Sequence, residues 1–364
     1  MPTRTLHPMR WNPALDDMQP YVGGKPIEEV AREYGVRDVI KLASNESPTE
    51  PFPEVLEVIR EHAGSVHRYP DDRCHALGLD AAERLGIPSE SLWFGGGSGD
   101  LMGSLSTALG GGGSEAVFGV PSFGLYPVFT TLAGGTGVGV ALDDEHRLDL
   151  GAMHDAIGDR TSVVYVCNPN NPTGTHRSAA DVEAFIAAAP PEVLVVVDEA
   201  YAEYVTAHDW GTMIPVALAR PNVVVLRTFS KIYGLAGLRI GYAVGQPDTL
   251  AGLRRAQRPF TVGQLAQAAA REALRYPGRV EQRRLENDRG RRILFDGLTD
   301  RGLGAVPSQA NFVYCDLGAE QDRIVEELLR KGVIIRTYGG GWSRVSVGTE
   351  LENRRFLMAL DTSL

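Results

Sequence analysis

The middle of the chain contains four apolar runs rich in β-branched residues, which begin near residues 116, 163, 193 and 223. Each run ends in a polar turn, and helix-like stretches such as residues 178–188 lie between them. Alternation of buried strands with helices predicts a mainly parallel sheet that helices cover on its faces. Open sheets of this kind bind ligands just beyond the carboxyl ends of their strands. The pattern therefore predicts an α/β fold whose functional residues lie in the turns that follow these runs.

Composition excludes several classes of function. With 364 residues, 43% of them hydrophobic and 23% charged, the chain has the composition of a soluble globular protein. A formal net charge of -10 argues against nucleic acid as a partner. The eight histidines lack metal-ligand spacing, and the three cysteines form no C-x-x-C pair, so we expect no metal and a reducing compartment. No apolar stretch approaches the roughly 20 residues of a membrane span, which predicts no membrane partner and a cytoplasmic location.

Residues 228–242, TFSKIYGLAGLRIGY, contain the most informative polar turn. Lys231 follows a buried run directly, and a lysine at such a position is unusual. Its amine could condense with a carbonyl if its neighbours keep it unprotonated often enough, although a lone lysine in a loop is more often simply solvated. Thr228, Ser230 and Arg239 surround it in sequence, and they offer the hydroxyl and guanidinium donors that a phosphate beside the lysine would need.

This segment resembles the lysine segment of the pyridoxal-phosphate aminotransferases of fold type I. It is most similar to the histidinol-phosphate aminotransferase group, whose pattern is S-K-x-x-x-L-A-G-L-R-x-G. The resemblance implies pyridoxal 5'-phosphate as the cofactor and a large domain over residues 41–250 with a mainly parallel central sheet. It also implies a small α/β domain made from both chain ends, residues 251–364 and an N-terminal segment, residues 1–40.

Further family motifs follow in the expected order. Residues 168–174, NPNNPTG, match the family at every position, which implies that Asn171 contacts the phenolic oxygen of the cofactor. Asp198 ends a buried run, and the resemblance implies that it pairs with the protonated ring nitrogen and keeps the ring an electron sink. An ion pair with an arginine is the alternative for Asp198. Tyr201 matches the family tyrosine at the phenolic oxygen, and together with Lys231 and Asp198 it completes the expected catalytic set.

A glycine loop that opens a helix at residues 92–109 predicts a phosphate site, because backbone N–H groups at a helix start bind anions. Ser98, Gly99 and Asp100 would supply that start, although the family usually has G-N-G-S-D-E here. Phe123 would stack on the ring of the cofactor. A simple helix cap and ordinary core packing are the alternatives for these two features. The residues expected to bind the cofactor are Tyr69, Ser98, Gly99, Asp100, Phe123, Asn171, Asp198, Tyr201, Thr228, Ser230, Lys231 and Arg239.

Tyr69, in the sequence RYPDD, matches the Y-P-D motif of the family. In that family this tyrosine reaches the cofactor phosphate of the neighbouring subunit. The resemblance therefore implies a homodimer with shared active sites.

The substrate residues are less constrained. Arg344, in R-x-S-V-G-T, matches the substrate arginine of the family and could grip a carboxylate or a phosphate bidentately. Arg336 matches a second arginine that helps to hold a substrate phosphate, with a surface charge as the alternative. Asn45 would line the substrate cavity, and Tyr21 lies in a segment that crosses its entrance. Departures from the family pattern occur at Gly23, Ser47, Thr49, Glu50 and in the short loop of residues 337–343.

The resemblance implies transamination, with Lys231 as the general acid and base. The expected reaction is that of histidinol-phosphate:2-oxoglutarate aminotransferase in histidine biosynthesis, whose partners are a small amino donor and a 2-oxo acid or phosphorylated ketone. An aromatic or broader amino-acid aminotransferase is one alternative, and a decarboxylase or specialised enzyme on the same scaffold is another. A regulatory cofactor-binding domain would be expected to carry a DNA-binding segment or to lack Lys231.

Overall fold

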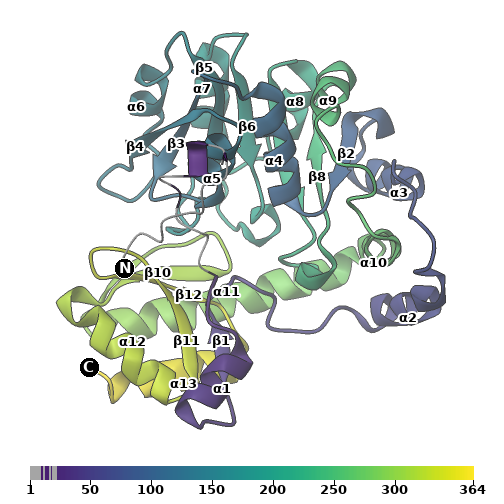
Figure 1. The fold of residues 1–364 in the computed structure, drawn as a ribbon. Helices are drawn as coiled ribbons and strands as arrows, with labels where there is room; N and C mark the ends of the chain where they lie inside the picture. Colours follow the sequence, from purple (N-terminus) through teal and green to yellow (C-terminus); the bar gives the residue numbers. More distant parts are fainter. Residues whose placement is uncertain (1–9, 11–12, 16–17, 19–22) are drawn as a thin grey trace.

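The computed structural model describes residues 10, 13–15, 18 and 23–364, and over these residues the chain forms a large and a small β-sheet (Figure 1). The seven strands of the large sheet, in pairing order, are β2 (Leu92–Gly95), β8 (Gly241–Val244), β7 (Val223–Thr228), β6 (Leu194–Asp198), β5 (Thr161–Cys167), β3 (Glu115–Val120) and β4 (Thr136–Ala141).

Only β8 runs antiparallel among the described strands of the large sheet, and it does so against both β2 and β7. Strands β4, β3, β5, β6 and β7 pair in parallel. The expectation of a mainly parallel sheet is therefore confirmed. As a consequence, the carboxyl ends of β2, β5, β6 and β7 lie at one edge of the sheet, where ligands of open α/β sheets bind.

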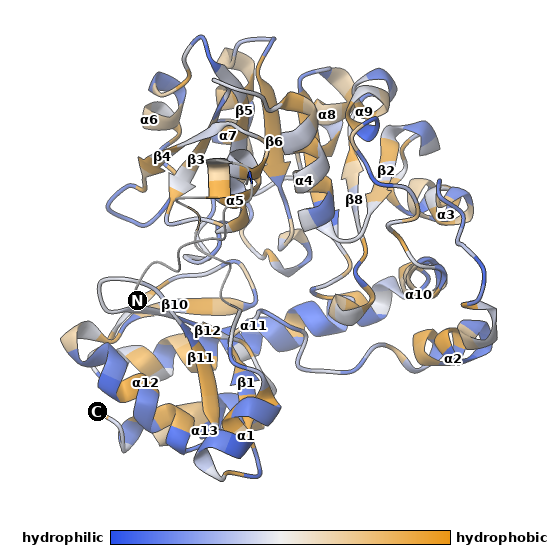
Figure 2. Ribbon diagram, viewed as in Figure 1, coloured by the Kyte–Doolittle hydropathy of each residue, from blue (hydrophilic) through white to orange (hydrophobic). Residues whose placement is uncertain are grey.

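Helices cover both faces of the large sheet because alternate strand residues point to opposite sides. Val196 packs in the cluster that contains α4 (Ser98–Leu109), α5 (Leu125–Leu132) and α9 (Pro247–Arg254), whereas Val195 and Val197 pack on the opposite side. The helices that contribute side chains to that opposite cluster are α2 (Pro53–His62), α3 (His75–Leu85), α6 (Leu150–Asp155), α7 (Ala179–Ala188), α8 (Ile214–Ala219) and α10 (Gln264–Leu274). Figure 2 shows the strands between these layers as largely hydrophobic.

The small sheet contains strands from both ends of the chain, in the order β1 (Ile40–Leu42), β11 (Val333–Thr337), β12 (Trp342–Ser346), β10 (Phe312–Asp316) and β9 (Gly304–Val306). Ile40 pairs with Val333 in parallel, which confirms that the small α/β unit draws on both chain ends. The helices of this part are α1 (Ile27–Tyr34), α11 (Pro277–Thr299), α12 (Gln321–Arg330) and α13 (Glu350–Asp361). Short 3-10 helices are η1 (Pro13–Leu15), η2 (Ala63–Ser65), η3 (Ser89–Ser91), η4 (Ala202–Tyr204), η5 (Ala236–Leu238) and η6 (Gly318–Glu320).

Helix α11 connects the two halves of the molecule (Figure 1). It packs against α13 and β9, and it also contacts η4 beneath the large sheet. Its surface is mostly hydrophilic in Figure 2, as its arginine-rich sequence indicates. The division of the chain at residues 40 and 250 stays a prediction. Near residue 40, β1 belongs to the small sheet. Beyond residue 250, α10 packs against α2 and α3.

None of the helices among the described residues is both long and apolar enough to cross a membrane. In the same residues, no three His, Cys, Asp or Glu side chains lie together as a metal ion would require.

Candidate active site

One cavity of about 370 Å³ lies at the carboxyl edge of the large sheet, where the small sheet faces it. The predicted site residues that line this cavity are Asn45, Ser98, Gly99, Phe123, Asn171, Asp198, Tyr201, Thr228, Ser230, Lys231, Arg239, Arg336 and Arg344. They come from both sheets, so the cavity is complete only when the two halves of the molecule are folded together.

Lys231 lies just beyond β7 with its amine in the cavity. Within the described residues its one hydrogen bond runs from Nζ to the carbonyl oxygen of Ser44, at 3.5 Å. Burial, helped by the nearby charge of Arg344, lowers the pKa of Lys231 from 10.5 to about 8. A larger fraction of this amine is therefore unprotonated near neutral pH than in an ordinary lysine, and a nucleophilic amine has to be unprotonated.

Asp198 ends β6 and is almost fully buried, with 3% of its surface exposed. Its carboxylate accepts hydrogen bonds from the Tyr126 hydroxyl at 2.8 Å and from the Ala200 amide at 3.2 Å. Burial raises the pKa of this carboxyl from 3.8 to about 6, although both hydrogen bonds oppose the rise. An ion pair with an arginine was the alternative for Asp198, but the groups that donate hydrogen bonds to its carboxylate are neutral. The carboxylate is thus suited to a cation that enters the cavity.

The start of α4 forms a compact cradle with Arg239. The guanidinium of Arg239 donates to Ser230 Oγ and to the Gly96 carbonyl, both at 3.4 Å. Gly97 has φ +92°, and a Cβ at this position would lie 2.5 Å from Arg239 Nη2. Arg239 itself has φ +55°, a strained conformation for a residue with a side chain. These features leave backbone N–H groups, a hydroxyl and a guanidinium around one small space, which suits a phosphate.

Tyr201 and Asn171 lie on either side of the cavity and have different partners. The Tyr201 hydroxyl accepts a hydrogen bond from Asn45 Nδ2 at 2.9 Å, and its ring lies edge-on to Phe312. Burial raises the pKa of Tyr201 well above 10, so the hydroxyl keeps its proton at neutral pH. Asn171 uses its side-chain oxygen to accept from Arg344 Nη1. Its amide nitrogen remains for a ligand in the cavity.

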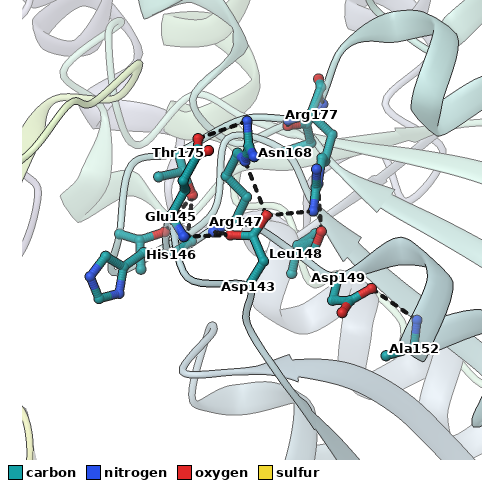
Figure 3. A network of polar contacts seen from close by, with 11 residues as sticks. Asp143, Glu145, His146, Arg147, Leu148, Asp149, Ala152, Asn168, Thr175 and Arg177 are labelled. Carbon is teal, nitrogen blue, oxygen red and sulfur yellow. Dashed lines mark hydrogen bonds and ion pairs between the residues drawn. The ribbon is translucent and has the colours of Figure 1, made fainter.

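The loop that contains Asn171 is fixed from behind by a network of polar contacts (Figure 3). Asn168 exchanges two hydrogen bonds with the backbone of Arg177, at 2.9 and 3.1 Å. The Arg177 guanidinium reaches Asp143 at 2.8 Å, and Asp143 also accepts from Arg147. Because the two ends of the loop bond to each other and Arg177 anchors one of them to Asp143, Asn171 has a defined position.

Arg344 presents a buried guanidinium without a carboxylate partner among the described residues. Besides Asn171, its donors reach the Tyr338 hydroxyl at 3.1 Å and the Ala43 carbonyl at 2.7 Å, while Nε has no partner. The backbone of Arg336 pairs with that of Arg344 between β11 and β12, and the Arg336 guanidinium makes no ion pair or hydrogen bond within the described part of the chain. Two cationic side chains in one cavity favour an anionic substrate.

Two predicted residues, Asp100 and Tyr69, do not line the cavity. Asp100 turns its carboxylate back to accept from the Gly96 amide at 3.0 Å, so it shapes the glycine loop and leaves only backbone N–H groups for a ligand. Tyr69 is 81% exposed and stacks on Phe260 with ring centroids 4.6 Å apart. Its role in a neighbouring subunit stays a prediction. Tyr21 lies outside the described residues.

The sequence prediction missed three contributors. Tyr126 holds Asp198, and the signal for it was a tyrosine three residues after Phe123, at the start of α5. The Tyr338 hydroxyl accepts from Arg344 and lies in the short loop of residues 337–343, whose length alone does not indicate this contact. Ser346 bonds Asn45 and lies two residues after Arg344, so the two-residue period of a strand could have indicated that both share a face.

These residues fit pyridoxal phosphate. Lys231 offers an amine of lowered pKa, Asp198 a buried carboxylate that lacks a cation, and the start of α4 with Arg239 a phosphate-sized cradle. Phe123, half-buried in the cavity wall, supplies a flat apolar ring. Each group therefore has the chemistry that one part of the cofactor requires.

Comparisons with known proteins agree with this geometry. The sequence profile described as "Aminotransferase class I and II" matches residues 37–360. Histidinol-phosphate aminotransferase from Moorella thermoacetica is 43% identical over 352 residues, which cover 95% of this chain and 91% of that protein. Histidinol-phosphate aminotransferase 1 from Nitrosococcus oceani is 43% identical over 354 residues, which cover 96% and 95% of the two chains.

The fold has a counterpart among solved structures. The crystal structure of histidinol-phosphate aminotransferase from Sinorhizobium meliloti in complex with pyridoxal-5'-phosphate matches with a TM-score of 0.90 at 31% identity, and the match covers 97% of each chain. The family profile covers most of the sequence, including both strands of the small sheet that carry Arg336 and Arg344. The chain therefore belongs to the class I and II aminotransferase family.

Proposed function

We propose that this chain is a pyridoxal-phosphate-dependent aminotransferase that exchanges an amino group between histidinol phosphate and 2-oxoglutarate. The observation that carries the proposal is the placement of Arg336 and Arg344 in the same cavity as Lys231 and Asp198. The names of the relatives from Moorella and Nitrosococcus support the choice of substrate.

The residues of the cavity divide the chemistry between them. Pyridoxal phosphate, when bound, supplies an electron sink beside the substrate amine. Asp198 would pair with its protonated ring nitrogen, which would compensate the buried carboxylate. Lys231 Nζ would hold the cofactor, and as a free amine it would accept the proton from the substrate α-carbon. The pKa of about 8 keeps part of that amine ready to accept a proton near neutral pH.

The two arginines bind the anionic groups of the substrates. Arg344 already has the buried, desolvated position in which a charged hydrogen bond is strong, and its unpartnered Nε faces no internal acceptor. Arg336, which has no described partner, is available for the phosphate of histidinol phosphate. Glutamate carries two carboxylates and can use the same pair of cations.

A single-turnover experiment tests the substrate. The glutamate-loaded enzyme would be mixed separately with imidazole-acetol phosphate and with phenylpyruvate, and the visible absorbance of the bound cofactor would be followed. We expect a rapid return of the starting spectrum with the phosphorylated ketone and a slow return with phenylpyruvate. A faster return with phenylpyruvate would instead support an aromatic aminotransferase, and no return with either would indicate a decarboxylase or a specialised enzyme.

The variant Arg336→Ala sharpens this test. Loss of a charged hydrogen bond is worth about 10- to 100-fold in rate, and we expect that loss for the phosphorylated ketone but not for phenylpyruvate. Arg330→Ala is the matched control, because Arg330 is an exposed arginine on α12 that does not line the cavity. Equal losses for both ketones would remove the phosphate role of Arg336.

The proposal also includes a homodimer with shared sites and a cytoplasmic location. Exposed Tyr69, stacked on Phe260 at the surface, supports the dimer because an exposed aromatic pair is suited to an interface. The location follows the expectation for a biosynthetic enzyme that uses free glutamate.

A further inference from the structure

Ser346, Asn45 and Tyr201 form a buried chain of hydrogen bonds that leads from the small sheet to the cavity. The backbone N–H of Asn45 donates to Ser346 Oγ at 2.9 Å, and Ser346 Oγ also lies 2.9 Å from the side-chain oxygen Oδ1 of Asn45. Asn45 Nδ2 lies 2.9 Å from the Tyr201 hydroxyl oxygen. Asn45 is 1% exposed and Ser346 is 3% exposed, so water does not compete for these bonds.

The directions of these bonds follow from their donors. Ser346 Oγ already accepts from the Asn45 backbone, so its own proton has to find another acceptor, and Asn45 Oδ1 is the one in reach. A flipped amide would aim a second donor at Ser346 and leave the serine proton without a described acceptor. Ser346 therefore sets which end of the Asn45 amide faces Tyr201.

The consequence reaches the cavity. Because Asn45 Nδ2 is a donor only, the Tyr201 oxygen has to accept from it, and the hydroxyl proton of Tyr201 is left to point elsewhere. Tyr201 lines the cavity, and within the described residues no other hydrogen bond uses this hydroxyl. We propose that Ser346 and Asn45 are positioning residues that aim the Tyr201 proton into the cavity, where the proposed function requires a donor to the phenolic oxygen of the cofactor.

The backbone around Asn45 supports this role. Asn45 has φ +54°, a left-handed conformation that asparagine tolerates better than most residues. Asn311 Nδ2 donates to the backbone carbonyl of Asn45 at 3.1 Å and so fixes the turn. The backbone conformation of Asn45 and its bond from Asn311 hold the Asn45 side chain between Ser346 and Tyr201, so it does not point toward a substrate.

The proposal predicts a shift in a titration that needs no substrate. A hydrogen bond from Tyr201 would stabilise the negative charge of the phenolic oxygen. That charge would then attract the proton on the Lys231 nitrogen less strongly, so the pKa of this nitrogen would be lower. In Ser346→Ala the Asn45 amide is free to flip, and Tyr201 can donate to Asn45 Oδ1 instead. We expect the pH midpoint of the visible absorbance of the bound cofactor to rise by up to about one unit, a tenfold change in the proton equilibrium.

Coupling to Tyr201 distinguishes positioning from general damage. In a Tyr201→Phe background, Ser346→Ala should not move the midpoint further, because the proton that Ser346 directs is gone. Ser346→Thr should restore the wild-type midpoint. Ser343→Ala is the matched control: Ser343 is a buried serine on the same strand whose hydroxyl accepts from Gln321 Nε2, and its loss should leave the midpoint unchanged.

Two results would overturn the proposal: an unchanged midpoint in Ser346→Ala, or an equal shift with and without the Tyr201 hydroxyl. If Ser346→Ala does not fold, Asn45→Asp carries the same test in the same two backgrounds, since a carboxylate accepts the Tyr201 proton. The proposal depends on the proposed function only for the cofactor, so a different preferred ketone leaves it intact. Failure of the wild-type protein to show any cofactor absorbance would count against the proposed function itself.

Discussion

At the scale of single residues, Asp198 shows how a functional group can cost stability. Its folded pKa of about 6 lies above the ordinary value of 3.8, so between these values the unfolded chain loses the proton first. The folded state then binds more protons than the unfolded state, and the free energy of unfolding falls as the pH rises through this window. At neutral pH the ionised Asp198 is a buried carboxylate, and the bonds from Tyr126 and Ala200 together with the charge of Lys231 offset its burial only in part.

We therefore expect Asp198→Asn to stabilise the cofactor-free protein. At pH 7.5 its free energy of unfolding should exceed that of the wild type by about 1–3 kcal/mol, the equivalent of roughly two pKa units at most. The gain should shrink as the pH falls and vanish only well below pH 3.8, where both states of the wild type are protonated at this residue. Denaturant unfolding of the two cofactor-free proteins at both pH values measures this difference.

Asp159→Asn provides the comparison, because Asp159 is an exposed aspartate in a surface turn. Its substitution should change little at either pH. A wild type that is more stable than Asp198→Asn at pH 7.5 would show that Tyr126 and Ala200 already compensate the charge of Asp198.

At the scale of elements, the segment before α6 supports the Asn171 loop through Asp143. This carboxylate accepts from Arg147 and Arg177, and its side chain is 22% exposed. Burial alone would raise its pKa, but the hydrogen bonds from Arg147 and the charge of Arg177 outweigh burial and lower it. The stabilisation is thus fully present above pH 3.8 and is lost as the pH falls through the lower folded value.

Asp143→Ala should lower the free energy of unfolding by roughly 1–3 kcal/mol at pH 7, because it leaves two partly buried arginines without their acceptor. The loss should diminish in acid, as the gain in Asp198→Asn does, but the two changes in the free energy of unfolding have opposite signs. Thermal unfolding across a pH series measures both trends. Asp144→Ala, at the exposed neighbouring residue, is the control, and an equal loss in that variant would mean that the network contributes nothing specific.

The sequence predicted β3, β5, β6 and β7 but neither β2 nor β4, and it did not indicate how distant strands pair. Val195 and Val197 belong to an unbroken apolar run that could be stable only between two helical layers, so β6 and the position of Asp198 at its end followed from local residues. The pairing of β1 with β11 could not be derived, because register between strands from opposite chain ends depends on the whole fold.

The same contrast applies to the site. Positions at strand ends were predictable, whereas hydrogen-bond partners were not. Asn45 lines the cavity as expected, but both ends of its amide are already occupied by Ser346 and Tyr201. Tyr126 reaches Asp198 only because α5 packs over the sheet at a particular angle, which local sequence does not specify.

At the scale of the whole molecule, the exposed pair of Tyr69 and Phe260 leads to a prediction about dimers. If Tyr69 completes the site of the neighbouring subunit, a heterodimer of one Tyr69→Phe chain and one Lys231→Ala chain contains one intact site. Such a purified heterodimer should show about half the wild-type activity, although both parent homodimers are impaired.

Steady-state assays at limiting cofactor, with heterodimers purified through two different affinity tags, measure this complementation. A chain that carries both substitutions, paired with a wild-type chain, is the control: its Lys231-containing site lacks the Tyr69 hydroxyl. Activity of the first heterodimer no higher than that of its parents would place Tyr69 outside the neighbouring site.

The parallel pairing of β1 with β11 also orders events during synthesis on the ribosome. All strands of the large sheet, with Asp198 and Lys231, have been made once β8 is complete, but β1 has to wait for a partner that is translated near the end. Residues 43–45, which follow β1, meet Arg344 and Ser346 only then. A nascent chain thus acquires the residues proposed to hold the cofactor well before those proposed to select a substrate.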